Sequence, residues 1–261
     1  MEPSEYEAMY RLEDTLWWYR GQRKITQALF NRFLPRGRSP LRILDCGAGS
    51  GGSLKLLAPL GEVTAFDVSH LAAAFYNQRQ RGRIARASVE AIPFPDGAFD
   101  LVTVFDVLAI LSPDQEAQAL RELSRVIKPG GYLFWREPAF MFLHGPHDHA
   151  THVQHRYTKR EMAERLNRMG LCPLRLSYSN TILFPIAFAR RMLARLRPAA
   201  GPPRSDVRPV PEPLNSILAA VLSAEAPLVA RFGLPLGLSV LALARKEEPT
   251  RPPAAQDSQP G

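Results

Sequence analysis

A glycine-rich turn after a short apolar strand carries the residue types best suited to chemistry. The stretch Leu41–Cys46 is apolar, and Gly47, Gly49 and Gly52 follow it directly. Glycines permit positive φ angles and let a ligand approach the backbone closely. A helix is predicted over Ser50–Ala58, and its first turn offers free N–H groups. The pattern therefore indicates a ligand-binding turn between a strand and a helix.

Two carboxylates flank this turn. Asp45 precedes Gly47 by two residues, where its negative charge could hold a cationic amino-acid ligand. Asp67 ends a second apolar run, Val63–Phe66. An acid at that point can accept hydrogen bonds from both ribose hydroxyls of an adenosine ligand. The alternatives are a turn acid at Asp45 and a helix N-cap at Asp67.

A nicotinamide cofactor is the rival ligand, because Gly47, Gly49 and Gly52 also satisfy the dinucleotide pattern GxGxxG. Two later runs have no counterpart in that pattern. They are IPFPDGAFDLV at 92–102 and LRELSRVIKPGG at 120–131. These runs argue against a nicotinamide cofactor. An NAD(P)-dependent oxidoreductase stays open as the alternative function.

Strand-like and helix-like runs alternate around the turn. Further strands are predicted at 84–87, 99–105, 132–135, 171–177 and 238–244, and further helices at 70–78, 113–127, 159–169, 182–196 and 214–230. This alternation indicates an α/β fold with a parallel sheet covered by helices on both faces. Residues 1–35 are predicted to form an amphipathic helical segment.

The blocks together resemble the class I S-adenosylmethionine-dependent methyltransferases, of the type 11 group that includes ubiquinone and menaquinone biosynthesis enzymes. DCGAGSG at 45–51, Asp67 and the two later runs occur in the order and spacing of that family. The resemblance implies a Rossmann-like, doubly wound sheet of seven strands with the last strand antiparallel. It also implies S-adenosyl-L-methionine as the cofactor.

The family resemblance and the chain pattern divide the sequence into five parts. They are a helical lid at 1–35, the cofactor-binding domain at 36–177, a helical cap inserted at 178–237, the last strand at 238–246 and a disordered tail at 247–261. The tail is assigned from its Pro-rich, polar composition. The cap and its position before the last strand follow from the resemblance alone.

The resemblance also implies contacts to the cofactor. Gly47, Ala48 and Gly49 would pass their backbone close to its methionine part, whose ammonium Asp45 would hold, and Asp67 would hold the ribose. The other implied contacts are Val68 on adenine, Ser88 and Val89 near the adenine amino group, Phe105 at the end of the fourth strand and Arg20 on the carboxylate. Arg20 follows Trp17–Tyr19, which could form a lid or simply pack on the sheet.

Two positions depart from the family pattern. Ser88 replaces the acid usual at its position, and Leu16 stands where one subgroup of bacterial relatives often has histidine. These departures keep open a non-catalytic, membrane-associated protein on the same fold.

Candidate catalytic residues lie after the fourth and fifth strands. Asp106 ends the fourth strand and faces either the acceptor or a helix start that it caps. A base would assist a hydroxyl acceptor, and five histidines lie between residues 144 and 155. His147, beside Asp148, is the first candidate and His155 the second. No metal is predicted, because the histidine spacing fits no closed zinc pattern and no cysteine accompanies it.

The positive charge is concentrated in one part of the chain. The net charge is +8, and residues 151–208 contain 12 Lys and Arg against 3 Asp and Glu. Within them, an apolar run at 182–189 precedes several arginines, so 182–197 could lie on a membrane interface. The alternative is a cap helix packed over the active site. No nucleic-acid-reading motif accompanies the charge, so that partner is not favoured.

The N-terminus is acidic and shows no signal-peptide pattern, and the chain has no uninterrupted apolar run of about 18 residues. We therefore expect a cytoplasmic protein, with contact to the inner face of the membrane through 182–197 as an option. The expected function is methyl transfer at O or C of a small-molecule acceptor, amphipathic or lipid-like acceptors included. The oligomeric state stays open.

Overall fold

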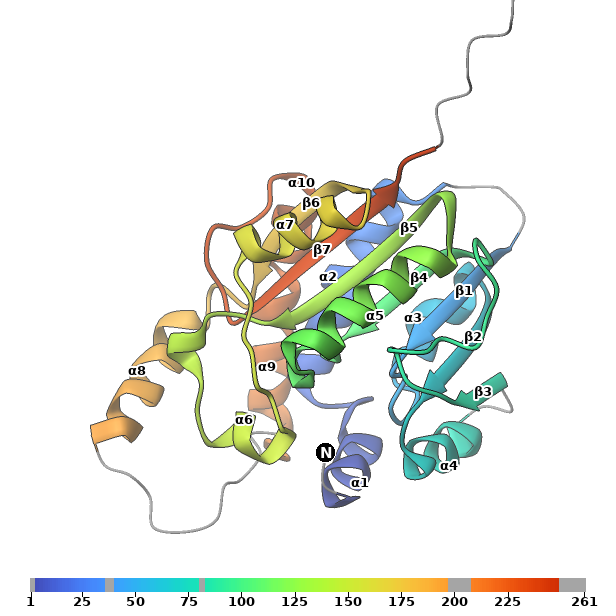
Figure 1. The fold of residues 1–261 in the computed structure, drawn as a ribbon. Helices are drawn as coiled ribbons and strands as arrows, with labels where there is room; N and C mark the ends of the chain where they lie inside the picture. The colour runs from blue at the N-terminus through green and yellow to red at the C-terminus, as the bar shows by residue number, and fades with distance from the viewer. Residues whose placement is uncertain (1–2, 36–39, 80–82, 197–207, 249–261) are drawn as a thin grey trace, which may run out of the picture.

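A computed structural model describes residues 3–35, 40–79, 83–196 and 208–248 (Figure 1). Within these residues, seven strands form one sheet in the order β3-β2-β1-β4-β5-β7-β6. The strands are β1 (Leu41–Cys46), β2 (Gly61–Asp67), β3 (Arg83–Arg86), β4 (Phe99–Phe105), β5 (Ile127–Pro138), β6 (Leu171–Ser179) and β7 (Ser239–Lys246). The predicted tail beyond residue 248 and Arg197 lie outside the described residues.

The sheet has the predicted topology. β1 to β5 pair in parallel, and β7 runs antiparallel to both of its neighbours, β5 and β6. The Rossmann-like, doubly wound sheet of seven strands with an antiparallel last strand is therefore confirmed. The strand order reverses between β1 and β4. Ligands of such sheets bind outside the carboxyl ends of the strands at this switch point.

Helices cover both faces of the sheet (Figure 1). They are α1 (Pro3–Leu12), α2 (Trp17–Phe33), α3 (Leu54–Leu57), α4 (His70–Arg79), α5 (Pro113–Val126), α6 (Pro146–Thr151), α7 (Lys159–Arg168), α8 (Phe184–Leu196), α9 (Glu212–Ser223) and α10 (Ala226–Arg231). Short 3-10 turns add η1 (Ala58–Leu60), η2 (Leu108–Ile110) and η3 (Met141–Leu143).

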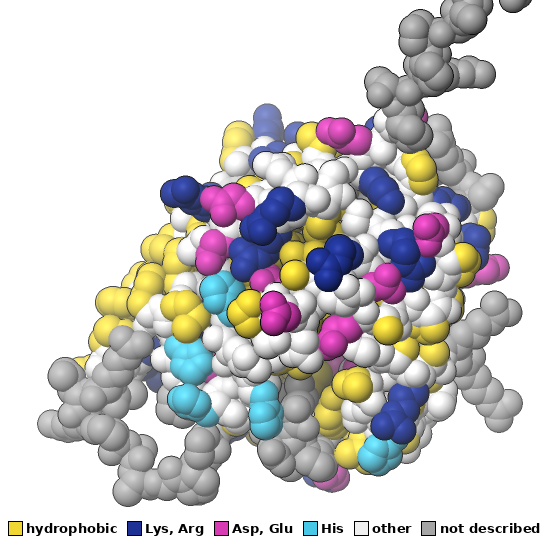
Figure 2. Space-filling view, viewed as in Figure 1, with side chains coloured by type: hydrophobic (Ala, Val, Ile, Leu, Met, Phe, Trp, Pro, Cys, Tyr) yellow, Lys and Arg dark blue, Asp and Glu magenta, His cyan; other side chains and the backbone are white. Residues whose placement is uncertain are grey.

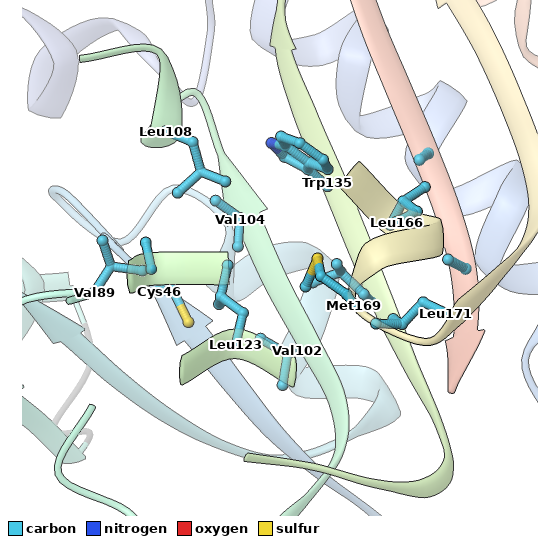
Figure 3. Packing of buried hydrophobic residues seen from close by; sticks show 14 of the residues in the cluster. Cys46, Val89, Val102, Val104, Leu108, Leu123, Trp135, Leu166, Met169 and Leu171 are labelled. Carbon is cyan, nitrogen blue, oxygen red and sulfur yellow. The ribbon is translucent and has the colours of Figure 1, made fainter. Parts of the chain in front are cut away.

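Two apolar cores lie on opposite faces of the sheet. On one face, Leu123 of α5 and Leu166 of α7 pack with Trp135 of β5, all fully buried (Figure 3). On the other face, α2, α9 and α10 bury a second cluster that includes Leu29 and Leu222. Burial of this many aliphatic and aromatic side chains holds the strand ends rigidly in place.

Several predicted boundaries moved for local reasons. The helix expected from Ser50 begins only at Leu54, because Gly51 keeps the backbone at φ +87°. The single helical segment expected at 1–35 is two helices, α1 and α2, separated by residues 13–16. The helix expected at 214–230 is likewise divided into α9 and α10 near Glu225.

The segment between β6 and β7 contains α8, α9 and α10. α9 lies close against α2: a Cβ on Gly21 of α2 would stand 2.6 Å from Leu222 Cδ2. The stretch Glu212–Arg231 is long and apolar enough to cross a membrane, judged by length and composition, and 39% of its window is buried. Its inner face belongs to the second core, and a core helix of a soluble domain has the same composition.

Candidate cofactor and acceptor site

Asp45 ends β1 in a buried position and is held by two hydroxyl groups. Thr103 Oγ1 donates to Asp45 Oδ1 at 2.7 Å, and Ser53 donates to Oδ2. The residue is 1% exposed. Burial raises the pKa of Asp45 to about 6, against the lowering effect of the two hydroxyl donors. The carboxylate is therefore ionised at neutral pH and keeps lone pairs for a further donor.

The glycine turn curls from β1 across the end of β2. The amides of Gly47 and Ala48 both donate to the carbonyl oxygen of Phe66, at 2.9 and 3.0 Å. Gly47 and Gly49 have φ angles of +67° and +55°, which L side chains rarely adopt. A Cβ on Gly47 would also lie 2.5 Å from Val107 Cγ2. Conformation and close packing both require glycine at this position.

Asp67 joins the end of β2 to the glycine turn. Its Oδ2 accepts the Gly49 N–H at 2.9 Å, and its Oδ1 accepts the Ser69 N–H at 2.9 Å. The side chain is 6% exposed, and burial raises its pKa. Asp67 therefore orients the glycine turn. This role differs from the helix N-cap, which was the alternative interpretation of Asp67 from the sequence.

The first helix lies directly over this turn. A Cβ on Gly49 would stand 3.5 Å from Met9 Cε. Burial is the main cause that raises the pKa of Tyr6, and the negative charge of Asp67 raises it further. Tyr6 is 8% exposed. Side chains of α1 therefore occupy space beside both the turn and the acid.

The residues after α1 fasten it to the turn. Glu13 accepts a hydrogen bond from Ser50 and forms an ion pair with Arg79 at 2.9 Å. Arg79 also donates to Asp14 Oδ2 at 2.7 Å. Behind the turn, a cavity of about 550 Å³ lies between α1, α3 and α4. Its lining includes Gly51 and Arg79 but neither Asp45 nor Asp67, so it is separate from the acid pair.

Comparison with known proteins shows which family the sequence around this site resembles. A family model described as a methyltransferase domain, Methyltransf_11, matches residues 44–135. That range contains the turn and both acids. Residues 44–135 therefore match a class I S-adenosylmethionine-dependent methyltransferase domain. Its cofactor is S-adenosyl-L-methionine.

Curated relatives match less than half of this chain. The malonyl-[acyl-carrier protein] O-methyltransferase of Enterobacter lignolyticus is 39% identical over 114 residues, covering 43% of this chain and 44% of the relative. The demethylmenaquinone methyltransferase of Thermus thermophilus is 40% identical over 104 residues, covering 37% and 46%. The match therefore spans less than half the length of each of these relatives.

A solved structure shares the whole fold. It is the 1,6-didemethyltoxoflavin-N1-methyltransferase of Burkholderia thailandensis with bound S-adenosylhomocysteine. The TM-score is 0.54 at 19% identity, covering 94% of this chain and 87% of the other. At that identity the likeness concerns the fold and leaves the acceptor open.

The residues of the methyltransferase domain fit its cofactor. Asp45 and Asp67 supply carboxylates for an ammonium and a ribose, and the left-handed glycines of the turn between them carry no side chain. Val68, expected to pack on adenine, is 63% exposed next to Asp67. An apolar side chain held in solvent beside the ribose acid is what an aromatic base needs as a packing surface. These roles stay predictions.

The other adenine candidates lie in a local turn. Ser88 Oγ accepts the Glu90 N–H at 3.2 Å, and Ser88 pairs with Ala91 in an isolated bridge. Val89 is buried in the first core. Ser88 therefore shapes the turn, and any contact from Val89 to the cofactor would come from its backbone.

Asp106 lies at the carboxyl end of β4 in a left-handed conformation, φ +58°. It forms an ion pair with Arg136 of β5. The Arg136 guanidinium lies 4.8 Å from the Trp18 ring centroid and 5.1 Å from that of Phe105. The following turn, η2, receives its side-chain hydrogen bonds from Glu137 of β5, whose carboxyl group accepts the Leu108 and Ala109 N–H groups. The ion pair and two rings thus form one cluster at the sheet edge.

Arg20 contacts α9 in this structure. Its Nη1 forms an ion pair with Glu212 of α9 at 3.5 Å, and Trp17 and Trp18 pack against the second core. Asn215 of α9 accepts the Trp17 N–H at 2.7 Å. The contact from Arg20 to the cofactor carboxylate stays a prediction, whereas α1 is the helix that covers the turn.

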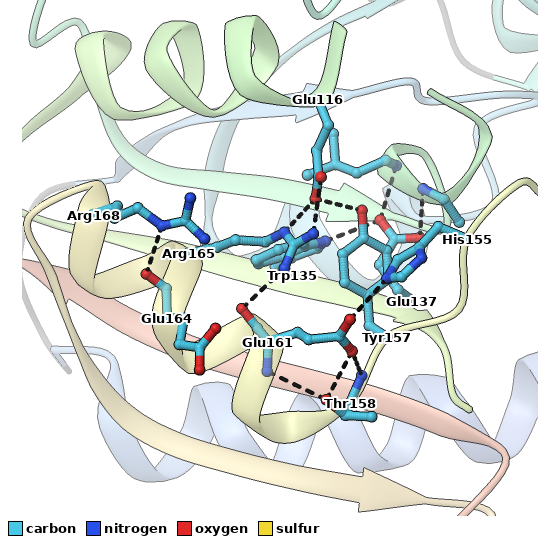
Figure 4. A network of polar contacts seen from close by, with 12 residues as sticks. Glu116, Trp135, Glu137, His155, Tyr157, Thr158, Glu161, Glu164, Arg165 and Arg168 are labelled. Carbon is cyan, nitrogen blue, oxygen red and sulfur yellow. Dashed lines mark hydrogen bonds and ion pairs between the residues drawn. The ribbon is translucent and has the colours of Figure 1, made fainter. Parts of the chain in front are cut away.

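The two candidate histidines have different surroundings. Asp148, the neighbour of His147, pairs with Arg156 at 2.7 Å and with Arg191 at 3.4 Å. The His155 backbone donates to the carbonyl of Ala109 in η2, the turn that follows β4, at 3.0 Å. Its ring lies 3.2 Å from Glu161 Oε1 (Figure 4). His155 is therefore the candidate tied to the carboxyl edge of the sheet.

A buried acid, Glu137, supports that edge from the opposite face to Arg136. It accepts N–H groups from Trp135 Nε1 at 2.9 Å, Leu108 at 2.9 Å and Ala109 at 3.2 Å (Figure 4). Burial raises the pKa of Glu137 to about 8. Among the described residues, no group of three His, Cys, Asp or Glu side chains is arranged to hold a metal.

Sequence reasoning missed the contacts from the first helix and the partner of Asp106. Nothing in the sequence pattern indicates that Tyr6, Met9 and Glu13 lie against the glycine turn. The Asp106–Arg136 pair could have been found, because Phe105 and Arg136 are register partners on neighbouring parallel strands. Arg136 follows the predicted strand directly, as Asp106 follows Phe105.

Proposed function

We propose that this chain transfers a methyl group from S-adenosylmethionine to a small-molecule acceptor, at O or C. The observation that supports it is the pair of buried acids, Asp45 and Asp67, on either side of the left-handed glycine turn. The names of the relatives include an O-methyltransferase and a ubiquinone/menaquinone biosynthesis C-methyltransferase. Both acceptor atoms are therefore consistent with this domain.

The acids would divide the binding of the cofactor. S-adenosylmethionine, when bound, supplies a methyl group already activated by a positively charged sulfur. Asp45, with its pKa near 6, is ionised at neutral pH and accepts donors from the ammonium. Asp67 accepts the ribose hydroxyls, and Val68 provides apolar contact for the base. Alignment of this kind contributes most of what the protein adds to the reaction.

On the acceptor side we favour His155 over His147 as a base, which reverses the order expected from the sequence. The reason is the backbone bond from His155 to Ala109, beside the end of β4, and the engagement of Asp148 by two arginines. Asp106 stands at the same edge and is 35% exposed as a side chain. A base at this edge would accept the proton of a hydroxyl acceptor.

An acceptor with an apolar part is favoured by the loop after β5. Met141 and Phe142, in η3, follow the carboxyl end of β5 and are 47% and 45% exposed. Exposed apolar side chains beside a sheet edge that binds ligands favour contact with an apolar molecule. We therefore include amphipathic and lipid-like acceptors in the proposal. A cytoplasmic location, expected from the sequence, is a separate part of the proposal.

The test uses the purified chain with S-adenosylmethionine carrying a labelled methyl group. Thermal-shift measurements with S-adenosylmethionine, NAD⁺ and NADP⁺ first separate the methyltransferase from the oxidoreductase alternative. Labelled cofactor is then incubated with fractionated metabolite and lipid extracts. Transfer of label to an extract component, absent from the Asp67→Ala variant, supports the proposal. Stabilisation by a nicotinamide cofactor alone, or cofactor binding without transfer to any fraction, contradicts it.

A further inference from the structure

α8 presents an apolar face to solvent. Ile186 and Leu193 of α8 are 63% and 64% exposed, and Ile182, in the turn just before the helix, is 52% exposed. Together with the exposed Pro185 and Ala189, they recur at helical spacing on one side. In a helix that packs on a soluble core, the apolar side faces inward. In α8 the outward side is apolar.

The inner side of α8 is fixed to the protein body by aromatic and ionic contacts. Phe184 is buried, and its ring centroid lies 6.4 Å from Phe140. Arg191 pairs with the buried Asp148. Just before the helix, Glu225 accepts the Ile182 N–H at 2.8 Å. The apolar face is therefore presented by an anchored helix.

The loop after β5 extends this face. Phe142 contacts Phe188 of α8 with ring centroids 6.1 Å apart, and Met141 precedes it in η3. Both Met141 and Phe142 are nearly half exposed. Figure 2 shows hydrophobic side chains gathered at the left edge of the molecule over α8, with histidines over α6 beside them. We call Met141, Phe142, Ile182, Ile186 and Leu193 the α8 patch.

We infer that the α8 patch docks on an anionic lipid bilayer, with α8 lying in the interface. Residues 184–196 contain no acidic residue, and the exposed Arg190 follows the apolar face directly. The segment 151–208 around them is strongly basic. Apolar burial and attraction between arginines and anionic head groups act together at such a surface.

A second copy of the chain is the less favoured occupant. A symmetric pair joined through the α8 patch would place two basic segments opposite each other. Like charges facing each other oppose such an interface, whereas an anionic bilayer neutralises them. The inference concerns binding alone and does not depend on methyl transfer.

Vesicle co-sedimentation with the full chain tests it. We expect pelleting with vesicles of phosphatidylcholine and phosphatidylglycerol, and at least tenfold weaker partitioning to phosphatidylcholine alone. Ile186→Asp combined with Leu193→Asp should reduce partitioning at least tenfold. The matched control is Leu228→Asp on α10, an exposed leucine outside the α8 patch that should pellet like the wild type. Arg190→Glu should weaken binding to anionic vesicles only.

Absence of wild-type pelleting with anionic vesicles overturns the inference, and so does equal pelleting of the Ile186→Asp, Leu193→Asp variant. Light scattering after size-exclusion chromatography tests the other occupant, a second copy of the chain. A wild-type dimer that this variant converts to a monomer, without vesicle binding by either, assigns the α8 patch to self-association. All substituted positions are exposed, so circular dichroism should report a folded chain in each variant.

Discussion

The Asp67 carboxylate accepts the backbone N–H of Gly49 at 2.9 Å, so the acid that closes β2 also fixes the turn that follows β1. The two residues belong to neighbouring parallel strands whose carboxyl ends meet at the same edge. We therefore propose that one carboxylate has two functions in the site. It holds the turn in its left-handed conformation, and it offers its remaining lone pairs to a ligand.

Replacing Asp67 with alanine should weaken binding of S-adenosylmethionine at least tenfold. Hydrogen bonds to a charged acceptor contribute about 1.5–3 kcal/mol each, and the variant loses those to the ribose together with the order of the turn. Isothermal titration calorimetry measures the change.

The control for this variant is Asp100→Asn. Asp100 lies on β4 near the opposite end of the sheet, where it accepts the Arg42 N–H at 2.8 Å and pairs with Lys128 at 2.7 Å. It should lose some stability and keep its cofactor affinity. Unchanged affinity in Asp67→Ala would remove the ribose assignment.

Gly47→Ala should destabilise the fold more than Gly170→Ala does. Both glycines have nearly the same φ, +67° and +69°. A Cβ on Gly47 lies 2.5 Å from Val107 Cγ2, whereas nothing lies within 4 Å of a Cβ on Gly170. The Gly170 variant therefore isolates the backbone strain, about 1–2 kcal/mol. Urea unfolding of both variants gives the difference.

A second substitution separates the two causes at Gly47. Val107→Ala in the Gly47→Ala background should recover part of the lost stability, because the overlap falls on the Val107 methyl groups. If Gly47→Ala and Gly170→Ala lose the same free energy of unfolding, the close packing at Val107 has no energetic weight.

The sheet was predictable because its signals are local. β1 and β4 have the predicted bounds, since each is an apolar run ended by residues that favour turns. The positions of Asp45 and Asp67 were predictable for the same reason, because strand ends determine which side chains reach the carboxyl edge. Capping is also a local signal: the Thr158 side chain accepts the Glu161 N–H at the start of α7.

Contacts between distant segments were not predictable from these signals. Glu13 meets Ser50, and Asp148 meets Arg191, only after the chain has folded. His147 and Asp148 are adjacent in sequence, but the short helix α6 directs the Asp148 carboxylate to Arg156. Proximity along the chain is a weak guide to side-chain pairing, because burial favours arginine partners for an enclosed carboxylate.

Glu13→Gln should speed the association of S-adenosylmethionine. Tyr6 and Met9 of α1 lie beside Asp67 and Gly49, so the cofactor must gain access to space next to this helix. Glu13 holds the helix end through Ser50 and Arg79, and a neutral amide weakens the contact with Arg79. Stopped-flow fluorescence of the nearby tryptophans would measure the association rate.

The matched control is Glu7→Gln, which removes an exposed pair with Arg11 within α1 itself. It should leave the association rate unchanged, since exposed pairs contribute little. Amide exchange within residues 6–12 should rise in Glu13→Gln and stay constant in the control. Equal association rates in the two variants would mean that α1 does not limit entry.

The stability of the fold should fall as the pH rises from about 6.5 to 8, and Glu137 is the group responsible. Its pKa is near 4.5 in an unfolded chain and about 8 when buried in the folded protein. Between these values the folded state keeps a proton that the unfolded state releases, so unfolding becomes easier as protons become scarce. One such group gives a slope of up to about 1.4 kcal/mol per pH unit.

Glu137→Gln is neutral throughout and should flatten the slope, whereas Glu164→Gln on the exposed side of α7 should keep it. Chemical denaturation at several pH values measures all three proteins, and a wild-type stability that is constant across this range would show that Glu137 is ionised in the folded state.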